Sequence, residues 1–153
     1  MASQRIMLID NEAGLCRMME AVLKDQGYQV KSFTRPVQAV AEFSAGDYDL
    51  IISDIKMPEM DGLELTDQVR QQDEHNNHYT YVILLTARES VAALSEAFDR
   101  GVDDFIYKSD MTKQLIPRIF AANRMADRQN TLLRANALLI ENNRDLEATN
   151  IID

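Results

Sequence analysis

The sequence predicts an α/β fold, in which a five-stranded parallel sheet is doubly wound with helices on both faces and is followed by one long helix. Three observations support this prediction. Five short apolar runs alternate with segments whose apolar residues recur at helical spacing, and this alternation builds a parallel sheet. Four of the five runs end in an acid, a hydroxyl or an amine. The last helical pattern shows no stop signal before Asp153.

Length and charge narrow the class of protein. The 153 residues suit one domain with an appendage. Sixteen basic against 25 acidic side chains give a net charge of −9, which argues against direct binding to nucleic acid. The only cysteine, Cys16, lies on the apolar side of a helical pattern and is expected to pack, which suits a reducing cytoplasm. Because no signal peptide and no bilayer-length apolar run occur, we expect a soluble cytoplasmic protein without membrane contact.

The first half of the chain contains two strands and two helices. Residues 5–9 are an apolar run, and residues 28–33 alternate as an edge strand should. The helix between them should end at Gly27, and its apolar residues are Leu15, Met18, Met19, Val22 and Leu23. The second helix should start with Thr34 as N-cap and Pro36 in its first turn, present Val37, Val40 and Ala41 inward, and close at Gly46.

The second half continues the same alternation. Residues 50–53 form a buried strand before Asp54, and a helix should run from Leu63 to about Gln71 with Leu63, Thr66 and Val69 on one side. Residues 73–78 lack periodicity, and their two histidines have no known metal-ligand spacing, so we expect a solvated loop. Residues 81–85 and 105–107 should be strands, and the helix between them should have Ser90 as N-cap, Val91, Leu94 and Phe98 inside, and Gly101 at its end.

The last helix should run from about Thr112 to Asp153 and span roughly 60 Å. Pro117 falls near its first turn, and Leu115, Ile116, Ile119 and Phe120 are expected to pack on the sheet. Farther along, apolar residues recur every seven positions, and an amide follows each by four: Met125, Leu132, Leu139 and Leu146, with Gln129, Asn136, Asn143 and Asn150. This pattern predicts a parallel two-stranded coiled coil. The alternative is a helix that packs back on its own domain or frays in solution.

The strand ends carry the chemistry. Asp10 and Asn11 follow the first run, Asp54 the third, Thr86 the fourth and Lys108 the fifth. With strand order 2-1-3-4-5, the flavodoxin-like order, these ends meet in one crevice. Two carboxylates suit Mg²⁺, and a hydroxyl and an ammonium suit phosphoryl oxygens. The set therefore predicts phosphoryl transfer to Asp54, although each residue alone is explained by capping, core packing or solvation.

Residues 4–122 resemble the receiver domains of bacterial two-component response regulators. The resemblance rests on Ile6-Met7-Leu8-Ile9 before Asp10, on the stretch from Asp54 to Gly62 with its Lys56-Met57-Pro58, on Leu85-Thr86-Ala87, and on the stretch from Gly101 to Lys108.

The resemblance implies roles for particular residues. Asp54 would be the phosphoacceptor, and Thr86 and Lys108 would bind the phosphoryl oxygens. Thr86 and Phe105 would act as the conformational switch. Asp10, Asn11, Asp54 and the carbonyl of Lys56 would hold Mg²⁺ or Mn²⁺. The donor would be a sensor histidine kinase or a phosphotransfer protein. Residues 123–153 would form a coiled-coil linker in a parallel homodimer, leading to an output domain, for which the final residues suggest a diguanylate cyclase.

Two departures from the family pattern leave alternatives open. Asn11 stands where a second acid is usual, so cation binding should weaken, and a pseudo-receiver that only dimerises is the alternative function. Glu12 is expected to favour the N-terminus of the following helix rather than the crevice. Ser109 stands where a proline is common, so we expect a trans Lys108–Ser109 peptide.

An enzyme is disfavoured on either of two patterns. A phosphatase with an aspartate nucleophile would need an acid at the position of Lys56. A flavin site would need a Ser/Thr/Gly-rich loop after residues 5–9, and this loop is acidic. We therefore expect a signalling domain and no enzyme within these residues.

Overall fold

A five-stranded parallel sheet organises the structure, a computed structural model that describes residues 4–44, 46–87 and 89–151. The strand order is β2-β1-β3-β4-β5, which confirms the predicted order. The strands pair in parallel along the whole sheet. Their bounds are Arg5–Ile9 for β1, Gln29–Phe33 for β2, Leu50–Asp54 for β3, Tyr81–Thr86 for β4 and Asp104–Tyr107 for β5.

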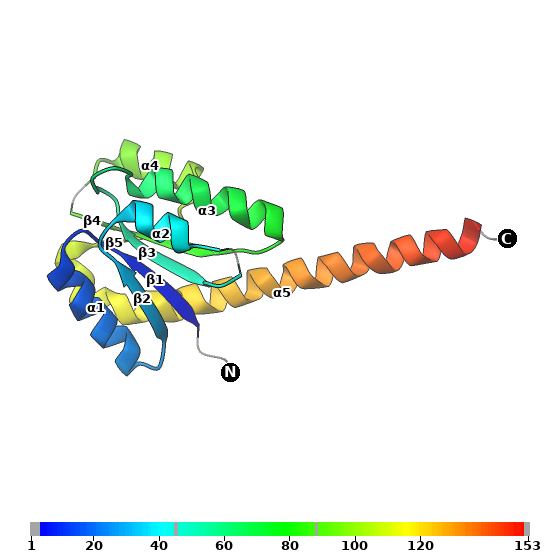
Figure 1. Ribbon diagram of the computed structural model, residues 1–153, viewed down its shortest axis with the longest axis horizontal. Helices are drawn as coiled ribbons and strands as arrows, with labels where there is room; N and C mark the ends of the chain where they lie inside the picture. Colours follow the sequence, from blue (N-terminus) through cyan, green and yellow to red (C-terminus); the bar gives the residue numbers. More distant parts are fainter. Residues whose placement is uncertain (1–3, 45, 88, 152–153) are drawn as a thin grey trace.

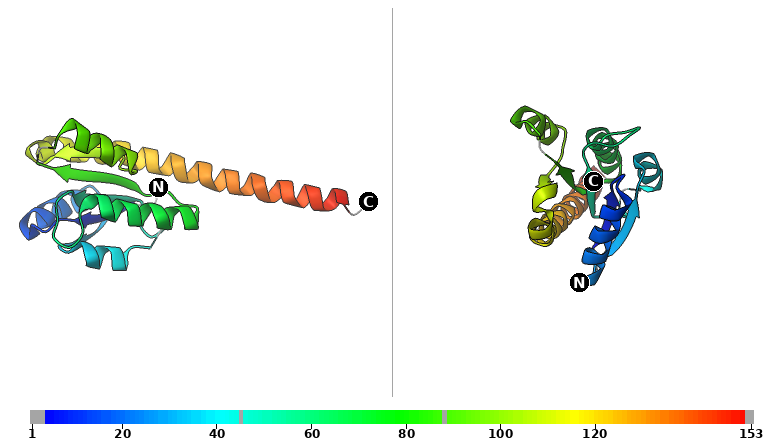
Figure 2. Two further views of the ribbon diagram at one scale, coloured as in Figure 1. Left: turned by 90° about the horizontal axis from the view of Figure 1, so that it is seen from above. Right: turned by 90° about the vertical axis from the view of Figure 1, so that its left-hand side faces the viewer.

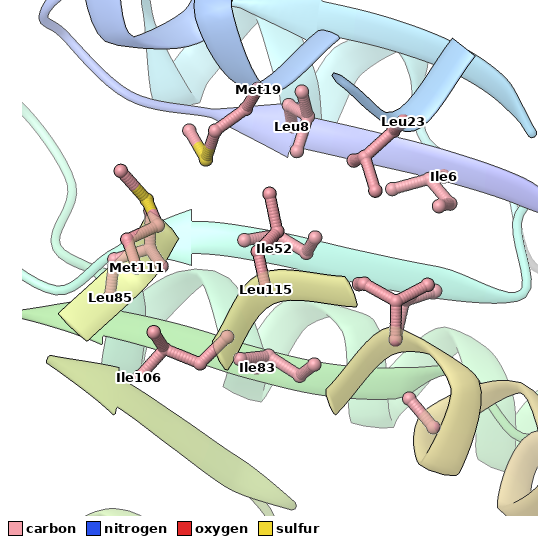
Figure 3. Packing of buried hydrophobic residues seen from close by; sticks show 13 residues of the cluster. Ile6, Leu8, Met19, Leu23, Ile52, Ile83, Leu85, Ile106, Met111 and Leu115 are labelled. Atoms are coloured by element: carbon pink, nitrogen blue, oxygen red, sulfur yellow. The ribbon is translucent and has the colours of Figure 1, made fainter. Parts of the chain in front are cut away.

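Helices cover both faces of this sheet (Figure 1). They are α1 (Ala13–Asp25), α2 (Pro36–Glu42), α3 (Gly62–Asn76), α4 (Val91–Asp99), the short 3₁₀ turn η1 (Lys108–Asp110) and α5 (Met111–Ile151). Successive residues of a strand point to opposite faces. Ile6, Leu8 and Ile52 therefore pack against α1 and α5, as Figure 3 shows for this cluster. Met7, Ile9 and Ile51 pack against α2, α3 and α4.

The long helix α5 begins on the sheet and then leaves it (Figure 2). Met111, Leu115, Ile119 and Ala122 are buried, and the helix continues through Pro117. Phe120, which the sequence placed on the sheet, is 58% exposed, because it lies on the outer side of this first segment. Beyond about Leu133 the helix projects alone. None of the helices in the described part of the chain is both long and apolar enough to span a membrane.

An amide fastens α5 to the loop that precedes β4, well past the predicted end of the receiver at residue 122. Asn130 is 9% exposed. Its Nδ2 donates to the carbonyls of Tyr79 and Ala126, both at 2.9 Å, and its Oδ1 accepts from the Tyr79 N–H at 2.8 Å. Asn77 Nδ2 also donates to the carbonyl of Leu133 at 3.4 Å. The packed part of α5 therefore extends to about Leu133.

The helix starting at Gly62 is longer than predicted. It runs to Asn76 and ends at Asn77 in the left-handed conformation, so residues 73–76 of the expected loop at residues 73–78 are helical. Tertiary contacts explain the extra length of the helix. Asp73 is buried, and its carboxylate accepts hydrogen bonds from the Thr80 N–H at 2.7 Å and from the Thr80 hydroxyl at 2.9 Å. Asp73 also lies 3.3 Å from His78 Nδ1, so that histidine belongs to a structural network.

Three other helix predictions were wrong in detail. The N-cap of α2 is Arg35 rather than Thr34. The inward residues of this helix are Pro36, Ala39 and the partly buried Val40, whereas Val37 is 44% exposed. In α4 the buried residue is Ala97, and Val91 and Phe98 are 84% and 50% exposed. In α1, Met18 and Val22 are largely exposed, while Cys16, Met19 and Leu23 are buried. In each of these helices a narrower face than predicted meets the sheet.

Candidate functional site

The carboxyl ends of the strands bring the predicted residues together at one edge of the sheet. Ile9 of β1 lies beside Ser53 of β3, and Asp54 lies beside Leu85 of β4. Asp10, Asp54 and Thr86 therefore follow one another across three neighbouring strands. Asp10 and Thr86 are fully buried and Asp54 is 5% exposed. Such burial of two carboxylates is costly unless opposite charge is close.

Lys108 supplies that charge. Its Nζ donates to Asp54 Oδ2 at 2.9 Å, and it lies 3.7 Å from Asp10 Oδ2 and 3.8 Å from Glu12 Oε1. Burial works to lower the pKa of Lys108, but the hydrogen bond to Asp54 and the three acidic charges raise it overall. Burial raises the pKa of Asp10, and the charge of Asp54 adds to this, against the Glu12 N–H and Lys108. One ammonium thus faces three carboxylates.

The loop after β3 is built close against the end of the strand. Gly62 N–H donates to the Ile55 carbonyl at 2.9 Å. A Cβ at Gly62 would lie 2.8 Å from the Asp54 carbonyl oxygen and 3.1 Å from Ile55 Cα. Only glycine fits there, because a backbone atom cannot yield as a flexible side chain can. The Lys56 ammonium points out of the crevice, 3.7 Å from Glu89, so only backbone atoms of Lys56 lie near Asp54.

Thr86 is the last residue of β4 and Phe105 lies in β5, and the switch role expected for these two residues stays a prediction. Among the described residues, Thr86 Oγ1 has no hydrogen-bond partner although it is buried. A buried hydroxyl without a partner calls for an acceptor or donor from a ligand or a rearrangement. The Phe105 ring is half-buried and meets the Phe98 ring edge to face, with centroids 4.9 Å apart. Its other neighbours belong to the apolar layer under α4.

The donor set suits a hard divalent cation. Within the described ranges, no three His, Cys, Asp or Glu side chains gather closely enough to hold a metal by themselves. Mg²⁺ does not need such a cage, because it binds through one or two carboxylates and keeps several waters. Asp10 Oδ2 is buried and lacks a hydrogen-bond partner in the part of the chain that is described, and Asp54 lies on the next strand. The Asp10 and Asp54 oxygens fit Mg²⁺. The Asn11 side chain, unlike these two carboxylates, is exposed.

Two local expectations can be compared directly with the structure. No peptide bond between described residues is cis, so Lys108–Ser109 is trans as predicted, and η1 starts there. The placement of Glu12 was missed: it is the N-cap of α1, but within the described structure its side chain makes no capping bond and lies near Lys108. The sequence signal that could have placed Glu12 near the crevice was its position two residues after Asp10, directly before Ala13. Cys16 is buried, with its pKa raised to about 11 by burial, which agrees with packing.

Comparisons with known proteins agree with this geometry. Residues 6–120 match the family described as response regulator receiver domain. The chain is 30% identical over 132 residues to the transcriptional regulatory protein ResD of Bacillus subtilis, covering 86% of this chain and 52% of ResD. It is 31% identical over 138 residues to the transcriptional regulatory protein DltR of Streptococcus agalactiae, covering 90% and 58%. The chain thus spans about half the length of the curated relatives it matches.

Solved structures share the fold. The chemotaxis protein CheY4 of Vibrio cholerae superposes with a TM-score of 0.72 at 26% identity, covering 79% of this chain and 99% of that one. The non-phosphorylated HemR receiver domain of Leptospira biflexa superposes with a TM-score of 0.72 at 21% identity, covering 78% and 94%. The second likeness concerns the fold alone. In both cases the match covers nearly the whole of the other chain and leaves part of this one unmatched.

Proposed function

This chain belongs to the response regulator receiver domain family, and we propose that Asp54 accepts a phosphoryl group from a sensor histidine kinase or a phosphotransfer protein. The single observation that carries the proposal is the position of Asp54: it is 5% exposed and lies 2.9 Å from Lys108 Nζ. A buried carboxylate beside an ammonium and a second buried acid suits attack on phosphorus.

The chemistry needs little beyond alignment and charge. A carboxylate oxygen of Asp54 forms the new bond to phosphorus while the bond between phosphorus and the donor imidazole breaks, which leaves an acyl phosphate. Lys108 balances the added negative charge. Asp10, Asp54, the Asn11 amide oxygen and the Lys56 carbonyl are the proposed ligands of Mg²⁺ or Mn²⁺, which neutralises phosphoryl oxygens when bound. No turnover of an outside metabolite is involved.

The phosphoacceptor is tested by exposing the full chain to a small phosphodonor with saturating Mg²⁺ and measuring its intact mass. We expect a gain of one phosphoryl group in the wild type and in the control Asp49→Asn, and none in Asp54→Asn. Asp49 precedes β3 and its carboxylate accepts from the Arg5 N–H at 3.2 Å, away from the strand ends. An unmodified wild type would favour the pseudo-receiver alternative.

We further propose that Thr86 and Phe105 convert the new charge into a change of the surface formed by α4, β5 and α5. Thr86 Oγ1 is buried without a partner in the described structure, so it is free to turn toward a phosphoryl oxygen. The Phe105 ring rests edge-on against Phe98 of α4, so a movement of the strand end alters that contact. Because α5 follows β5 directly, the same movement reaches the rod.

The proposed output is a parallel homodimer through the projecting part of α5, with residues 4–122 as receiver and residues 123–153 as linker. Leu132, Leu139 and Leu146 are 61–63% exposed, which leaves the stripe without a partner in the described chain. The side chain of Asn150, the last amide of the pattern, lies outside the residues whose side chains the structure describes.

A shallow groove on the rod supports this pairing. It has a volume of about 400 Å³ and is lined by Gln129, Leu132, Leu133, Ala135, Asn136 and Leu139. In a coiled coil each knob enters a hole formed by four residues of the facing helix. In a parallel, in-register pair, these six residues make up the two holes that receive the Leu132 and Asn136 side chains of a second copy.

Two leucines next to each other provide a matched test of the coiled coil. Leu139 and Leu138 are 61% and 60% exposed, but only Leu139 lies on the seven-residue stripe. We expect Leu139→Lys to convert the dimer to a monomer in sedimentation experiments and Leu138→Lys to leave it dimeric. Equal effects of both substitutions would refute the assigned seam.

The identity of the output domain is a further proposal. The final residues suggested a diguanylate cyclase, whereas the curated relatives are named transcriptional regulatory proteins, which favours a DNA-binding output as a second candidate. The net charge of −9 argues against DNA binding by these residues themselves, so a DNA-binding output would belong to another domain. Reading the gene beyond the codon for Asp153 tests the two candidates.

A further inference from the structure

Glu12 stands beside the proposed cation site, although the chain carries the neutral Asn11 at the adjacent position. We propose that Glu12 supplies the negative charge that Asn11 lacks and acts on the bound divalent cation from the rim of the crevice. This inference rests on the proposed function, because it assigns a role to a residue at the same site. It makes Glu12 a positioning residue for the cation.

The position of Glu12 is set by the start of α1. Its backbone N–H donates to Asp10 Oδ1 at 2.9 Å, which ties the residue to the buried acid. As the N-cap it could place its carboxylate over the helix N-terminus, but no such bond is made in the described structure. The carboxylate instead lies 3.8 Å from Lys108 Nζ. The side chain is 66% exposed, so it can adjust to an incoming ion.

A second observation points to a ligand at this place. Asp10 is fully buried, and its Oδ2 has no hydrogen-bond partner among the residues that are described. A buried carboxylate oxygen left in this way is costly unless a ligand or water completes it. Asp10 Oδ2 and Glu12 Oε1 lie at similar distances, 3.7 and 3.8 Å, from the same ammonium. The Asp10 oxygen that lacks a hydrogen bond and the rim carboxylate of Glu12 therefore lie around the same ammonium, at the mouth of the same crevice.

Charge and distance explain what Glu12 contributes. Three carboxylates, Asp10, Glu12 and Asp54, against the one ammonium of Lys108 leave two net negative charges, which match a divalent cation. Without Glu12 only one remains. The separation of 3.8 Å between Glu12 Oε1 and Lys108 Nζ exceeds a direct hydrogen bond, so the Glu12 carboxylate is not fixed to the lysine. Because Mg²⁺ retains several waters, a rim carboxylate can act through one of them.

Affinity for Mn²⁺, measured from the spectrum of the free ion by electron paramagnetic resonance, tests this assignment. Glu12→Gln keeps the size of the side chain and removes no capping bond. We expect it to weaken Mn²⁺ binding about five- to tenfold, as removal of one charge near a divalent ion at a surface should. The control Glu74→Gln removes an exposed charge near the far end of α3, roughly 18 Å along the helix from Gly62, and should change affinity less than about twofold.

A second variant keeps the charge explanation falsifiable. Adding Asn11→Asp to Glu12→Gln should restore binding to about the wild-type value, because the charge returns one residue away. Equal affinities for Glu12→Gln and Glu74→Gln would overturn the proposal, and so would a failed restoration in a double variant that melts like the wild type. If Glu12→Gln and Glu74→Gln bind Mn²⁺ equally well, Glu12 would serve only to hold Lys108.

Phosphorylation at saturating Mg²⁺ separates this inference from the proposed function. Glu12→Gln should still gain one phosphoryl group there, because excess cation compensates for weaker binding. A wild type that binds no Mn²⁺ and stays unmodified refutes both proposals. A wild type that binds and is modified, beside an unaffected Glu12→Gln, refutes only the role of Glu12.

Discussion

Replacing Asn130 by alanine should separate the rod from the domain that carries it. In the wild type the carboxamide accepts from Tyr79 N–H at 2.8 Å and donates to the Tyr79 carbonyl at 2.9 Å, so it satisfies both backbone groups of one residue. Losing these bonds costs about 1 kcal/mol each, and more if the Tyr79 groups stay dry. Alanine returns about 0.5 kcal/mol through its higher helix propensity. A net loss of about 1.5 kcal/mol follows.

Water moderates this loss. A groove of about 560 Å³ lies beside Asn130 and His78, so solvent can reach the exposed backbone groups of Tyr79 after the substitution. For a chain of this size, about 1.5 kcal/mol corresponds to a fall in Tm of about 3–6 °C. Thermal and urea unfolding of the full chain measure it, with Arg128→Ala, an exposed residue on the same helix, as control.

Hydrogen exchange gives the second readout. Asn130→Ala should speed exchange at the Tyr79 and Thr80 amides and in the α5 segment 126–133, while amides around Met111 stay protected. If Asn130→Ala and Arg128→Ala unfold alike and exchange alike, the amide does not fasten the rod. The packed domain would then end near residue 122.

Two other substitutions test how the chain supports its site. Gly62→Ala should destabilise by about 1–3 kcal/mol in urea unfolding, because the new Cβ meets the Asp54 carbonyl at 2.8 Å. Gly14→Ala in α1 meets only the flexible end of Arg17, at 3.9 Å, and should stabilise by about 0.5–1 kcal/mol. Equal effects would contradict the close approach at Gly62. Arg70→Met should cost about 3–5 kcal/mol in the same assay, because it leaves the mostly buried Asp103 without its cation, while Arg100→Met, which breaks a more exposed pair with Asp67, should cost at most about 1 kcal/mol.

The sheet and the meeting of the strand ends could be predicted because both follow from short-range rules. Apolar runs alternating with helical patterns leave few topologies, and parallel strands all end at one edge. Asp10, Asp54 and Lys108 were therefore expected together. In the structure the Lys108 ammonium lies 3.7 Å from Asp10 and 2.9 Å from Asp54. The roles assigned to them stay predictions.

What the sequence could not predict depends on tertiary partners. Asp73 looked like a loop residue, since nothing nearby in the sequence shows that Thr80 and Arg70 would satisfy its carboxylate inside the structure. Phe98 looked like a core residue, but Ala97 allows α4 to approach the sheet and turns Phe98 toward solvent and Phe105. Glu12 looked like a capping residue, and only the position of Lys108 gives its carboxylate another place to go.

Burial of the Asp10 carboxylate at the proposed site is expected to lower the stability of the fold at neutral pH. Burial is the largest influence on the pKa of Asp10 and raises it above the ordinary value of 3.8, so the attraction of Lys108 does not outweigh lost hydration. An acid whose pKa is higher in the folded state stabilises the fold most below pH 3.8, and this contribution is lost as the pH rises through the folded pKa.

Asp10→Asn removes the charge while nearly keeping the shape of the side chain. At pH 7.5 we expect a higher Tm than in the wild type, together with weaker Mn²⁺ binding, and the gain in Tm should shrink as the pH falls toward 4, the direction in which the wild-type carboxyl takes up its proton. Asp110→Asn, at an exposed acid in η1, should leave Tm unchanged at both pH values. A lower Tm for Asp10→Asn at pH 7.5 would mean that the ion pair with Lys108 outweighs the cost of burying the carboxylate. The carboxylates around Lys108 would then stabilise the fold, besides forming the proposed phosphoacceptor site.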